Sequence, residues 1–575
     1  MNYVVRPKLQ LVFAIMALLC VYFPTISHDF SRFDDPFIVE YYGINSTVSF
    51  FDVITPGRSF YYRPLVDLSY WLDSRLWGLQ PSFMHLENIA AHVVNVILVF
   101  LIASRLPGTS HVRSLPLLSA LLFGLHPINS EPVNWIAGRT DIFAGMFLFS
   151  AFYCFIRAME ERSTRFVCFG FGLFLVAVLA KETAAMFIPA VLLLSLYWPS
   201  ALKGDDALPY KAWRRRHITG PLAGVSSIGA SIFAITYFRR SGDNALSMIL
   251  DGSVDTLLKT VEAFGFYVKK FFLPLPLNAA IVEISPWYAI LGILALCLLL
   301  LTFRQSGISG VSFAIAALFI VPALIVASVP IAWTPFGERY LYLPSAFAVI
   351  GILSLSRSFM DRRELSRYFL PVTCGVVLIA SMVTVHRGTL WGDNFALMED
   401  IIKKSPDFGV ARNEYGILLK KKGLFAEAQA QFEIAAKKEN PENVDRIIRL
   451  NLIGMKMQGK RPDEMRDILL AEIGDKPRGD VELLKLLYKF DEHALGRAGS
   501  IVERKKIVAG LLETNEILYR RTANAHYLYR SGQLALSVGD TPAAARQFRK
   551  AAEKAPGGAF YREPALKLAE RLAAQ

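Results

Sequence analysis

Long runs of apolar side chains recur along this chain and constrain its fold more than any other feature. Several runs reach the roughly 17–25 residues that an α-helix needs to cross a bilayer. Only 19% of the 575 residues are charged, against about 25% in typical soluble domains. The sequence therefore predicts an all-α fold, a polytopic bundle of about eleven membrane helices. The apolar runs cover residues 9–26, 86–103, 115–125, 142–156, 166–180, 184–198, 218–238, 287–303, 311–329, 341–355 and 368–385.

Basic residues cluster in alternate connections between these runs, and this sets the expected topology. Positively charged loops remain preferentially on the cytoplasmic side, so we expect the N-terminus, with Arg6 and Lys8, to be cytoplasmic. Residues 256–273 carry Lys269 and Lys270 and are expected to form an interfacial or partial helix. Topology accounts for the net charge of +13, and no nucleic-acid partner is expected. The basic connections hold Arg105, Arg113, Arg157, Arg162, Arg165, Lys203, Lys211, Arg214–Arg216, Arg304, Arg357, Arg362, Arg363 and Arg367.

Composition changes after about residue 386, which predicts a membrane domain over 1–386 and a second helical domain over 387–575. The second part contains two segments with the spacing of tetratricopeptide repeats, in which small residues let paired helices approach. Repeats of this kind commonly bind peptides. An odd number of spans would place this domain on the extracytoplasmic side, together with the first loop, residues 27–83. The repeat positions are Gly416, Ala428, Phe432, Ala435 and Pro441, then Gly532, Ala544, Phe548, Ala551 and Pro556.

The same extracytoplasmic connections hold most of the unusual polar residues. A charge at the centre of a bilayer costs roughly 2.5–3.5 kcal/mol, so we expect these side chains at the outer surface or in a wet cavity. The first loop contains "FDDPFIVE", with Asp34 and Asp35 adjacent. Within the second span, "HLENIAAHVVN" aligns four polar residues on one helical stripe, which suits hydrogen bonds between helices or direct substrate contact. The candidate polar residues are Asp34, Asp35, Arg63, His126, Glu131, Arg139, Lys181 and Arg339.

These motifs resemble a known family. "YYRPL", "HLENIAAHVVN", "LHPINSEPVNWIAGRTD", "LAKE" and "ERYLYLPS", followed by tetratricopeptide repeats, are similar to the transmembrane and tetratricopeptide-repeat (TMTC-like) O-mannosyltransferases. The resemblance implies a GT-C glycosyltransferase fold, a sugar donor carried on a polyprenyl phosphate, and an acidic pair in the first outer loop. "FDDPFIVE" matches that pair. Animal relatives carry longer repeat arrays, which leaves the acceptor open.

The chemistry of such a transfer assigns roles to these residues. A hydroxyl that attacks the anomeric carbon needs a base, and we expect Asp34 in that role, with Asp35 as an orienting group or metal ligand. The departing phosphate needs positive charge, for which Arg339, Arg139, Arg63 and Lys181 are candidates, with His126 and Glu131 as further substrate-binding residues. No cofactor is certain; a divalent cation, Mg²⁺ or Mn²⁺, is one option.

Each of these residues also has a structural interpretation. Asp35 could cap a helix that Pro36 begins, and Arg339 could form an ion pair with Glu338 or another acid. His126 and Glu131 could cap a loop. Lys181 could extend its amine to the interface.

The expected function is sugar transfer from a polyprenyl-phosphate carrier to a hydroxyl of an extracytoplasmic protein or peptide that the repeats bind, with inversion. Membrane lipid is the other expected partner. The alternatives are transfer to a lipid or glycan, a non-catalytic membrane scaffold with peptide-binding repeats, and a transporter or channel. No internal inverted repeat favours transport. The short repeat array favours a bacterial inner membrane with a periplasmic site; the alternative is the lumenal side of the endoplasmic reticulum membrane.

Overall fold

In the computed structural model, the described part of the chain consists of helices joined by turns and irregular segments, of which 273–287 is a long one. The description covers residues 7–43, 46, 48–56, 62–107, 114–201, 207–222, 224, 253–305, 307–329, 332–362, 365–473, 481–556 and 558–574. No strand occurs within these ranges, which confirms the predicted all-α class. The chain separates into two compact units, Met1–Tyr415 and Gly416–Gln575.

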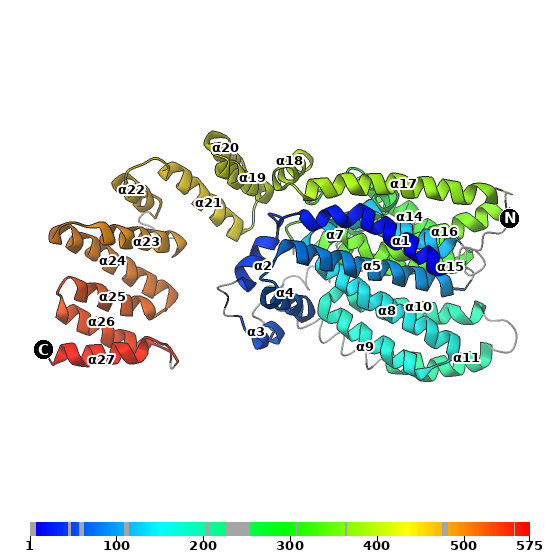
Figure 1. The fold of residues 1–575 in the computed structure, drawn as a ribbon, viewed down its shortest axis with the longest axis horizontal. Coiled ribbons are helices and arrows are strands. Elements are labelled where there is room, and N and C mark those ends of the chain that lie inside the picture. Colours follow the sequence, from blue (N-terminus) through cyan, green and yellow to red (C-terminus); the bar gives the residue numbers. More distant parts are fainter. Residues whose placement is uncertain are drawn as a thin grey trace. The chain divides into compact units, whose positions relative to one another are not determined.

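The first unit is a bundle of long apolar helices. Figure 1 shows α1, α5, α8 and α9 running along the bundle, with neighbours in this series packed on one another. Its helices are α1 (Pro7–Tyr22), η1 (Phe23–Ser27), α2 (Asp35–Tyr42), α3 (Phe50–Ile54), α4 (Pro64–Leu76), α5 (Pro81–Arg105), α6 (Leu115–Gly124), η2 (Pro127–Asn129), α7 (Ser130–Asn134), η3 (Ile136–Gly138), α8 (Arg139–Glu161), α9 (Thr164–Ala180), η4 (Glu182–Met186), α10 (Phe187–Tyr197), η5 (Trp198–Ala201), α11 (Ala207–Arg214), η7 (Arg215–Thr219), α13 (Val254–Phe272), α14 (Tyr288–Gln305), α15 (Ile308–Ser328), η8 (Glu338–Leu341), α16 (Tyr342–Arg362), α17 (Ser366–Trp391) and α18 (Asn394–Lys404).

Seven segments of the described chain are helical, long and apolar enough to cross a bilayer, and three shorter apolar helices accompany them. The chain is therefore a polytopic membrane protein. Ten of the eleven predicted apolar runs coincide with these helices. The remaining run, 218–238, lies mostly outside the described residues, so the count of eleven stays a prediction. The seven long segments are Pro7–Ser27, Pro81–Arg105, Ile136–Glu161, Tyr288–Gln305, Ile308–Ser328, Glu338–Asp361 and Ser366–Trp391.

Residues 256–273 form a regular helix, α13, that packs on α14 and α15. Gly265 and Gly292 allow the close approach: a Cβ atom at Gly265 would come within 2.6 Å of the Gly292 backbone nitrogen. The two lysines at the end of α13 differ in exposure: Lys270 is 4% exposed, whereas Lys269 is partly exposed. Whether α13 lies in the interface stays a prediction.

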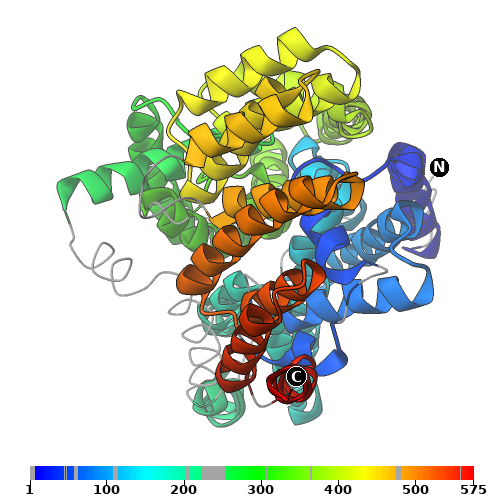
Figure 2. The ribbon, with the colours of Figure 1, turned by 90° about the vertical axis from the view of Figure 1, so that its left-hand side faces the viewer.

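The second unit is a series of helical hairpins. Figures 1 and 2 show α23 to α27 stacked in chain order, each packed on the next. The unit begins within α19 (Gly409–Lys421). Its further helices are α20 (Phe425–Ala436), α21 (Glu442–Met457), α22 (Pro462–Ile473), α23 (Val481–Arg497), α24 (Ile501–Thr522), α25 (His526–Ser537), α26 (Thr541–Lys554) and α27 (Arg562–Ala573).

Both predicted repeat motifs form the helix pairs that their spacing requires. Phe432 and Phe548 are fully buried, and their rings lie against Gly416 and Gly532, where a Cβ atom would come within 2.6 Å of the ring. The glycines therefore make room for the phenylalanines that fill each hairpin. This packing is compatible with tetratricopeptide repeats. The compact units divide after Tyr415, because α18 and the residue that follows it still contact the first unit: α18 packs on α17, and Lys404 and Ser405 form hydrogen bonds with Leu277 and Asn278.

Candidate functional site

The adjacent aspartates lie where the first apolar helix gives way to a short second one. After η1 the chain is irregular until α2 begins at Asp35, with Pro36 in its first turn. Proline suits this position because its fixed backbone angle and missing N–H match the start of a helix. Asp34 occupies the cap position, but its side chain forms no capping hydrogen bond. The pair is therefore not explained as a helix cap.

The two carboxylates point into different environments. Asp35 is fully buried and accepts hydrogen bonds from the backbone N–H groups of Ser31 (2.8 Å) and Ala137 (3.1 Å). It therefore joins its own loop to the turn that precedes α8. Asp34 is exposed, and no hydrogen bond to its carboxylate occurs within the described residues. Asp35 has the environment of a positioning group, whereas Asp34 has that of an accessible base.

Partial dehydration raises the pKa of both carboxyl groups. Burial raises the pKa of Asp35 to about 7, against the lowering effect of its two backbone hydrogen bonds. Burial also raises the pKa of Asp34, while the charges of Arg339 and Arg63 lower it. The Asp34 side chain is open to solvent, so the surrounding protein limits its hydration without enclosing it. A base with a raised pKa takes a proton more readily.

Arg339, one of the cations near Asp34, is held by a buried acid. Its Nη1 donates to Glu131 Oε1 at 2.8 Å, and its guanidinium lies over the Trp135 and Tyr340 rings. Burial raises the pKa of Glu131, and Arg339 opposes this. The predicted ion pair of Arg339 therefore exists, with Glu131 rather than Glu338 as the partner. Glu338 pairs instead with Lys270, at 2.5 Å.

Arg63 and Lys181 each have a carboxylate partner of their own. Arg63 donates through Nε and Nη2 to both oxygens of Glu182, at 3.1 and 2.7 Å. Lys181 is buried, lies 2.5 Å from Asp141, and its amine faces the Tyr340 ring at 5.4 Å. Burial lowers the pKa of Lys181, and Asp141 opposes this. A buried lysine with a carboxylate partner is not simply extended toward the interface.

We call this group the polar cluster, and define it as Asp34, Arg63, Glu131, Lys181 and Arg339. Shared neighbours join its members. The Tyr340 ring lies against both Lys181 and Arg339, and the charges of Arg339 and Arg63 both lower the pKa of Asp34. Four of its five members form ion pairs: Arg339 with Glu131 inside the cluster, and Arg63 and Lys181 each with an adjacent acid. The arrangement therefore places one carboxylate without a described hydrogen bond among cations that already have partners.

Arg139 lies apart from any open surface. Its side chain is fully buried and contacts Asp73 at 2.6 Å and Glu87 at 2.8 Å. Asn88 Oδ1 accepts from its Nε, and Ser69 and Met84 accept further bonds. With its donors engaged by several partners, Arg139 ties α4, α5 and α8 together. This is the environment of a positioning residue, and a role of Arg139 in substrate binding stays a prediction.

His126 has the capping environment that was its structural alternative. Its Nδ1 accepts from the Ile128 N–H at 3.3 Å, its Nε2 lies 3.1 Å from the Phe271 carbonyl oxygen, and its ring stacks on Phe271. Burial lowers the pKa of His126 to about 4, so the ring is neutral near pH 7. Both ring nitrogens form hydrogen bonds in this structure, and a role in substrate binding stays a prediction.

The polar stripe of α5 forms hydrogen bonds between helices. Asn88 donates to the Trp135 carbonyl oxygen at 3.0 Å. His92 lies 2.8 Å from the Tyr342 hydroxyl, and Asn95 donates to that hydroxyl at 2.8 Å. Asn88, His92 and Asn95 therefore connect α5 to its neighbours, whereas the buried ring of the fourth stripe residue, His85, has no hydrogen-bond partner among the described residues.

The acidic pair is the candidate place for a metal site, because carboxylates suit Mg²⁺ and Mn²⁺. Both oxygens of Asp35 already accept backbone N–H groups, and the described residues contain no group of three or more His, Cys, Asp or Glu that could hold an ion. The described side chains therefore do not assemble a protein metal site. Dependence on Mg²⁺ or Mn²⁺ stays a prediction, and no step below uses a metal.

Sequence reasoning missed one buried cation, Arg387. It is 2% exposed and pairs with Asp400 at 3.0 Å. Its position one residue past the predicted boundary at 386 assigned it to the repeat domain. An arginine inside the last turns of an apolar run, in "VTVHRGTL", was the available signal.

Comparison with known proteins finds similarity to protein O-mannosyltransferases over part of the chain. Residues 64–205 match the model described as dolichyl-phosphate-mannose-protein mannosyltransferase. The chain is 29% identical over 149 residues to protein O-mannosyl-transferase TMTC1 of Mus musculus, covering 24% of this chain and 16% of that protein. It is 34% identical over 145 residues to Tmtc1 of Drosophila melanogaster (25% and 16%). Human TMTC3 is 34% identical over 125 residues (21% and 13%).

These matches cover less than a fifth of each relative's length. The region matched by the family model includes His126, Glu131, Arg139 and Lys181. It does not include the acidic pair, Arg63 or Arg339. The roles of those residues therefore rest on the geometry described above.

Proposed function

We propose that this chain, whose residues 64–205 match the dolichyl-phosphate-mannose-protein mannosyltransferase model and which is similar in part to TMTC1, is a membrane glycosyltransferase of GT-C type. It transfers a sugar from a polyprenyl-phosphate carrier to a hydroxyl group of a protein. The names of the relatives favour mannose as the sugar. The observation that carries the proposal is Asp34, an exposed carboxylate with a raised pKa beside Arg339 and Arg63.

Asp34 acts as the general base. Its carboxylate takes the proton of the acceptor hydroxyl while that oxygen forms a bond to the anomeric carbon. The bond from the anomeric carbon to the phosphate oxygen breaks, and its electron pair stays on the phosphate. Attack from the face opposite the phosphate inverts the configuration. Asp35 holds the loop in place through Ser31 and Ala137, so that Asp34 stays fixed relative to α8.

Arg339 stabilises the phosphate as negative charge develops on it. Arg339 and Arg63 have the same partial exposure, 16% of the side chain, and both charges lower the pKa of Asp34, but the effect of Arg339 is the larger. Lys181, across the Tyr340 ring, and Arg63 add positive potential to the same region. Glu131 fixes the guanidinium through the ion pair described above. Arg139 serves as a positioning residue.

The repeat unit binds the acceptor peptide, and its hairpin packing supports this assignment. The alternation of basic connections supports an active site on the extracytoplasmic side. A bacterial inner membrane is the expected location from the short repeat array; the relatives named above are animal proteins.

An amide at position 34 tests the base directly. We expect Asp34→Asn to keep membrane insertion and donor binding but to lower transfer by roughly 10²–10⁴, measured with a polyprenyl-phosphate sugar and an acceptor peptide. Wild-type transfer should fall as the pH drops through the pKa of Asp34, which lies above that of an ordinary aspartate. The residual transfer of Asp34→Asn should lack this acidic limb.

Glu40→Gln is the matched control, because Glu40 is an exposed acid on α2, a few residues away. It should transfer at the wild-type rate. Full activity in Asp34→Asn would assign the base to another residue. If wild type and both variants insert but none transfers sugar, the chain is a scaffold.

A further inference from the structure

The loop that carries Asp34 has an irregular backbone, so its polar groups need partners other than those of a helix. It covers residues 28–34, between η1 and α2. Two of its N–H groups use acceptors close in sequence: that of Ser31 donates to Asp35 at 2.8 Å, and that of Phe33 donates to the Ser31 hydroxyl at 3.3 Å. Buried and half-buried backbone groups are nearly always paired in this way. The N–H group between these two has a distant acceptor.

Asn394, the first residue of α18, supplies that acceptor from 362 residues away. Its Oδ1 accepts from the Arg32 N–H at 2.8 Å, and its Nδ2 donates to the Phe30 carbonyl oxygen at 2.8 Å. One side-chain amide therefore pairs with two backbone groups of the loop. Removal of the amide would take a hydrogen-bond partner from both groups, and a partly buried polar group that loses its partner is costly.

Glu414, on α19, holds the side chain of the same arginine from 382 residues away. Its Oε2 accepts from Arg32 Nε at 2.9 Å and from Nη2 at 2.5 Å, and the Arg32 and Glu414 side chains are only 24% and 18% exposed. A guanidinium that donates through two nitrogens to one carboxylate is fixed in orientation as well as in position. Arg32 is therefore held by its backbone and by its side chain, two residues before Asp34.

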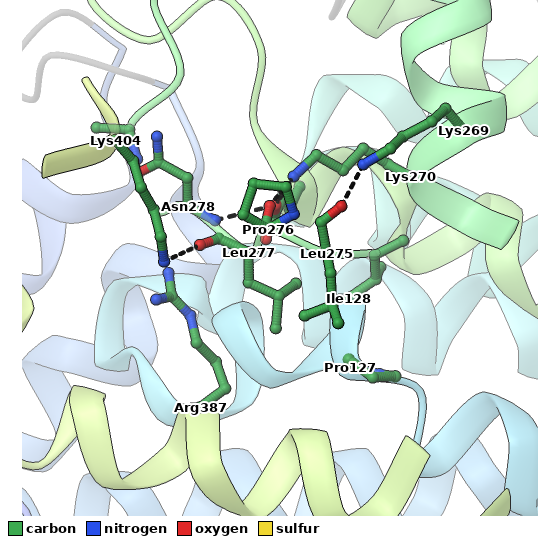
Figure 3. Close-up of polar contacts among 12 residues, drawn as sticks. Pro127, Ile128, Lys269, Lys270, Leu275, Pro276, Leu277, Asn278, Arg387 and Lys404 are labelled. Carbon is green, nitrogen blue, oxygen red and sulfur yellow. Dashed lines mark hydrogen bonds and ion pairs between the residues drawn. The ribbon is translucent and has the colours of Figure 1, made fainter. Parts of the chain in front are cut away.

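The helices that carry these two residues are fixed to each other and to the rest of the first unit. The Phe395 ring on α18 and the Tyr415 ring on α19 have centroids 4.8 Å apart. At the far end of α18, Lys404 donates to the Leu277 carbonyl oxygen at 2.6 Å, as Figure 3 shows. The support of the loop is therefore itself anchored at both ends of α18.

The position of Glu414 also gives α19 two roles. Glu414 lies two residues before Gly416, where a Cβ atom would come within 2.6 Å of the Phe432 ring. One continuous helix, α19, therefore carries both a contact to the Asp34 loop and the packing glycine of the first repeat motif.

We propose that Asn394 and Glu414 are positioning residues for sugar transfer. They hold the backbone and the side chain of Arg32, and thereby fix Asp34 at the place from which it takes the proton of the acceptor. Both act through Arg32 and not by contact with substrate. The inference rests on the proposed role of Asp34 as the base, and it adds that the reaction depends on α18 and α19 as well as on the apolar helices.

Steady-state transfer by the purified full chain, with a polyprenyl-phosphate sugar and an acceptor peptide, tests Asn394. Asn394→Ala should lower kcat by roughly 10–100-fold, because a small displacement of a catalytic group is costly, and should leave the KM for the sugar donor unchanged. Alanine favours a helix more than asparagine does, so the substitution does not weaken α18 itself. The loss of activity at low pH should persist in Asn394→Ala, since Asp34 still titrates, whereas Asp34→Asn should lack it.

A pair of substitutions tests the second contact. Arg32→Gln and Glu414→Gln should each lower kcat about tenfold, and the double variant should lose no more than either single variant, because all three lack the same contact. Additive losses would contradict this contact. Lys403→Ala is the matched control: Lys403 is a 70% exposed residue near the other end of α18 that pairs only with Glu399 on its own helix, and this variant should have the kcat of the wild type.

Amide hydrogen exchange of the loop, measured by mass spectrometry on the same proteins, separates positioning from chemistry. Exchange in residues 28–34 should be faster in Asn394→Ala and in Glu414→Gln, and should match the wild type in Lys403→Ala and Asp34→Asn. Glu414→Gln changes a partly exposed pair, so it keeps the test valid if Asn394→Ala fails to fold.

The two measurements together decide the proposal. Unchanged exchange in both variants would overturn the support of the loop, and normal kcat despite faster exchange would overturn the positioning role. If Asp34→Asn transferred sugar at the wild-type rate, the assignment of the base would fail. Low kcat with faster exchange in Asn394→Ala would even then assign Asn394 to the support of the site.

Discussion

At the scale of single residues, the site is defined by which charges have partners. Four buried or half-buried cations are paired: Arg63 with Glu182, Lys181 with Asp141, Lys270 with Glu338 and Arg339 with Glu131. Asp34 has no described hydrogen bond to its carboxylate. Removing one member of a buried pair leaves the other charge uncompensated, which is strongly destabilising. A single substitution at Arg339 therefore combines two effects, on folding and on chemistry.

A double variant separates these two effects. We expect Arg339→Gln to lower transfer about a hundredfold, since a charge-assisted contact in a dry site is worth about 3 kcal/mol, and to reduce thermal stability because Glu131 loses its partner. Arg339→Gln combined with Glu131→Gln should recover stability, measured as melting temperature in detergent, but not transfer.

Glu131→Gln alone controls for loss of the acid. It should retain more transfer than Arg339→Gln, because Arg339 keeps its charge. If the double variant recovered transfer together with stability, Arg339 would be structural, and Lys181 or Arg63 would be left as the phosphate ligand.

At the scale of elements, local patterns were predictable and long-range pairing was not. Hydropathy and residue spacing within short stretches of sequence predict ten of the apolar helices and both repeat hairpins. The structure has helices at each of these places. Glu131 and Arg339 are 208 residues apart, and nothing in either segment identifies its partner. The same limit applies to Arg139, whose burial depends on acids of two other helices.

The glycine in each repeat hairpin gives a prediction about packing. Gly532→Ala places a methyl group within 2.6 Å of the buried Phe548 ring, and overpacking of this kind costs about 1–3 kcal/mol. We expect faster amide hydrogen exchange in α25 and α26 of the full chain, measured by mass spectrometry.

Gly496→Ala is the matched control. No atom of another residue lies within 4 Å of the added Cβ atom there, and alanine favours a helix by roughly 0.5–1 kcal/mol over glycine. Exchange in α23 should stay the same or become slower. Unchanged exchange in α25 and α26 of Gly532→Ala would contradict the packing role of the glycine.

At the scale of the whole molecule, the distribution of charge predicts which side of the membrane each part faces. The alternation of basic connections predicts a cytoplasmic N-terminus and extracytoplasmic repeats. Reporter fusions test this: a fusion at Arg215 should report the cytoplasm, and a fusion after Gln575 the opposite side. A cytoplasmic signal from the second fusion would contradict the model with eleven spans and separate the repeats from Asp34.

The pairing of Glu131 with Arg339 also has a consequence for biosynthesis. A ribosome that has made Glu131 must add 208 residues before the arginine partner exists, and Ala137 must emerge before Asp35 receives its second hydrogen bond. Until then an acid destined for burial has to stay hydrated or protonated. The nascent chain therefore inserts several helices before the ion pair between Glu131 and Arg339 can form. A product that stops before residue 339 keeps Glu131 without its cation. Quality-control proteases can recognise such a product as a loosely packed membrane domain.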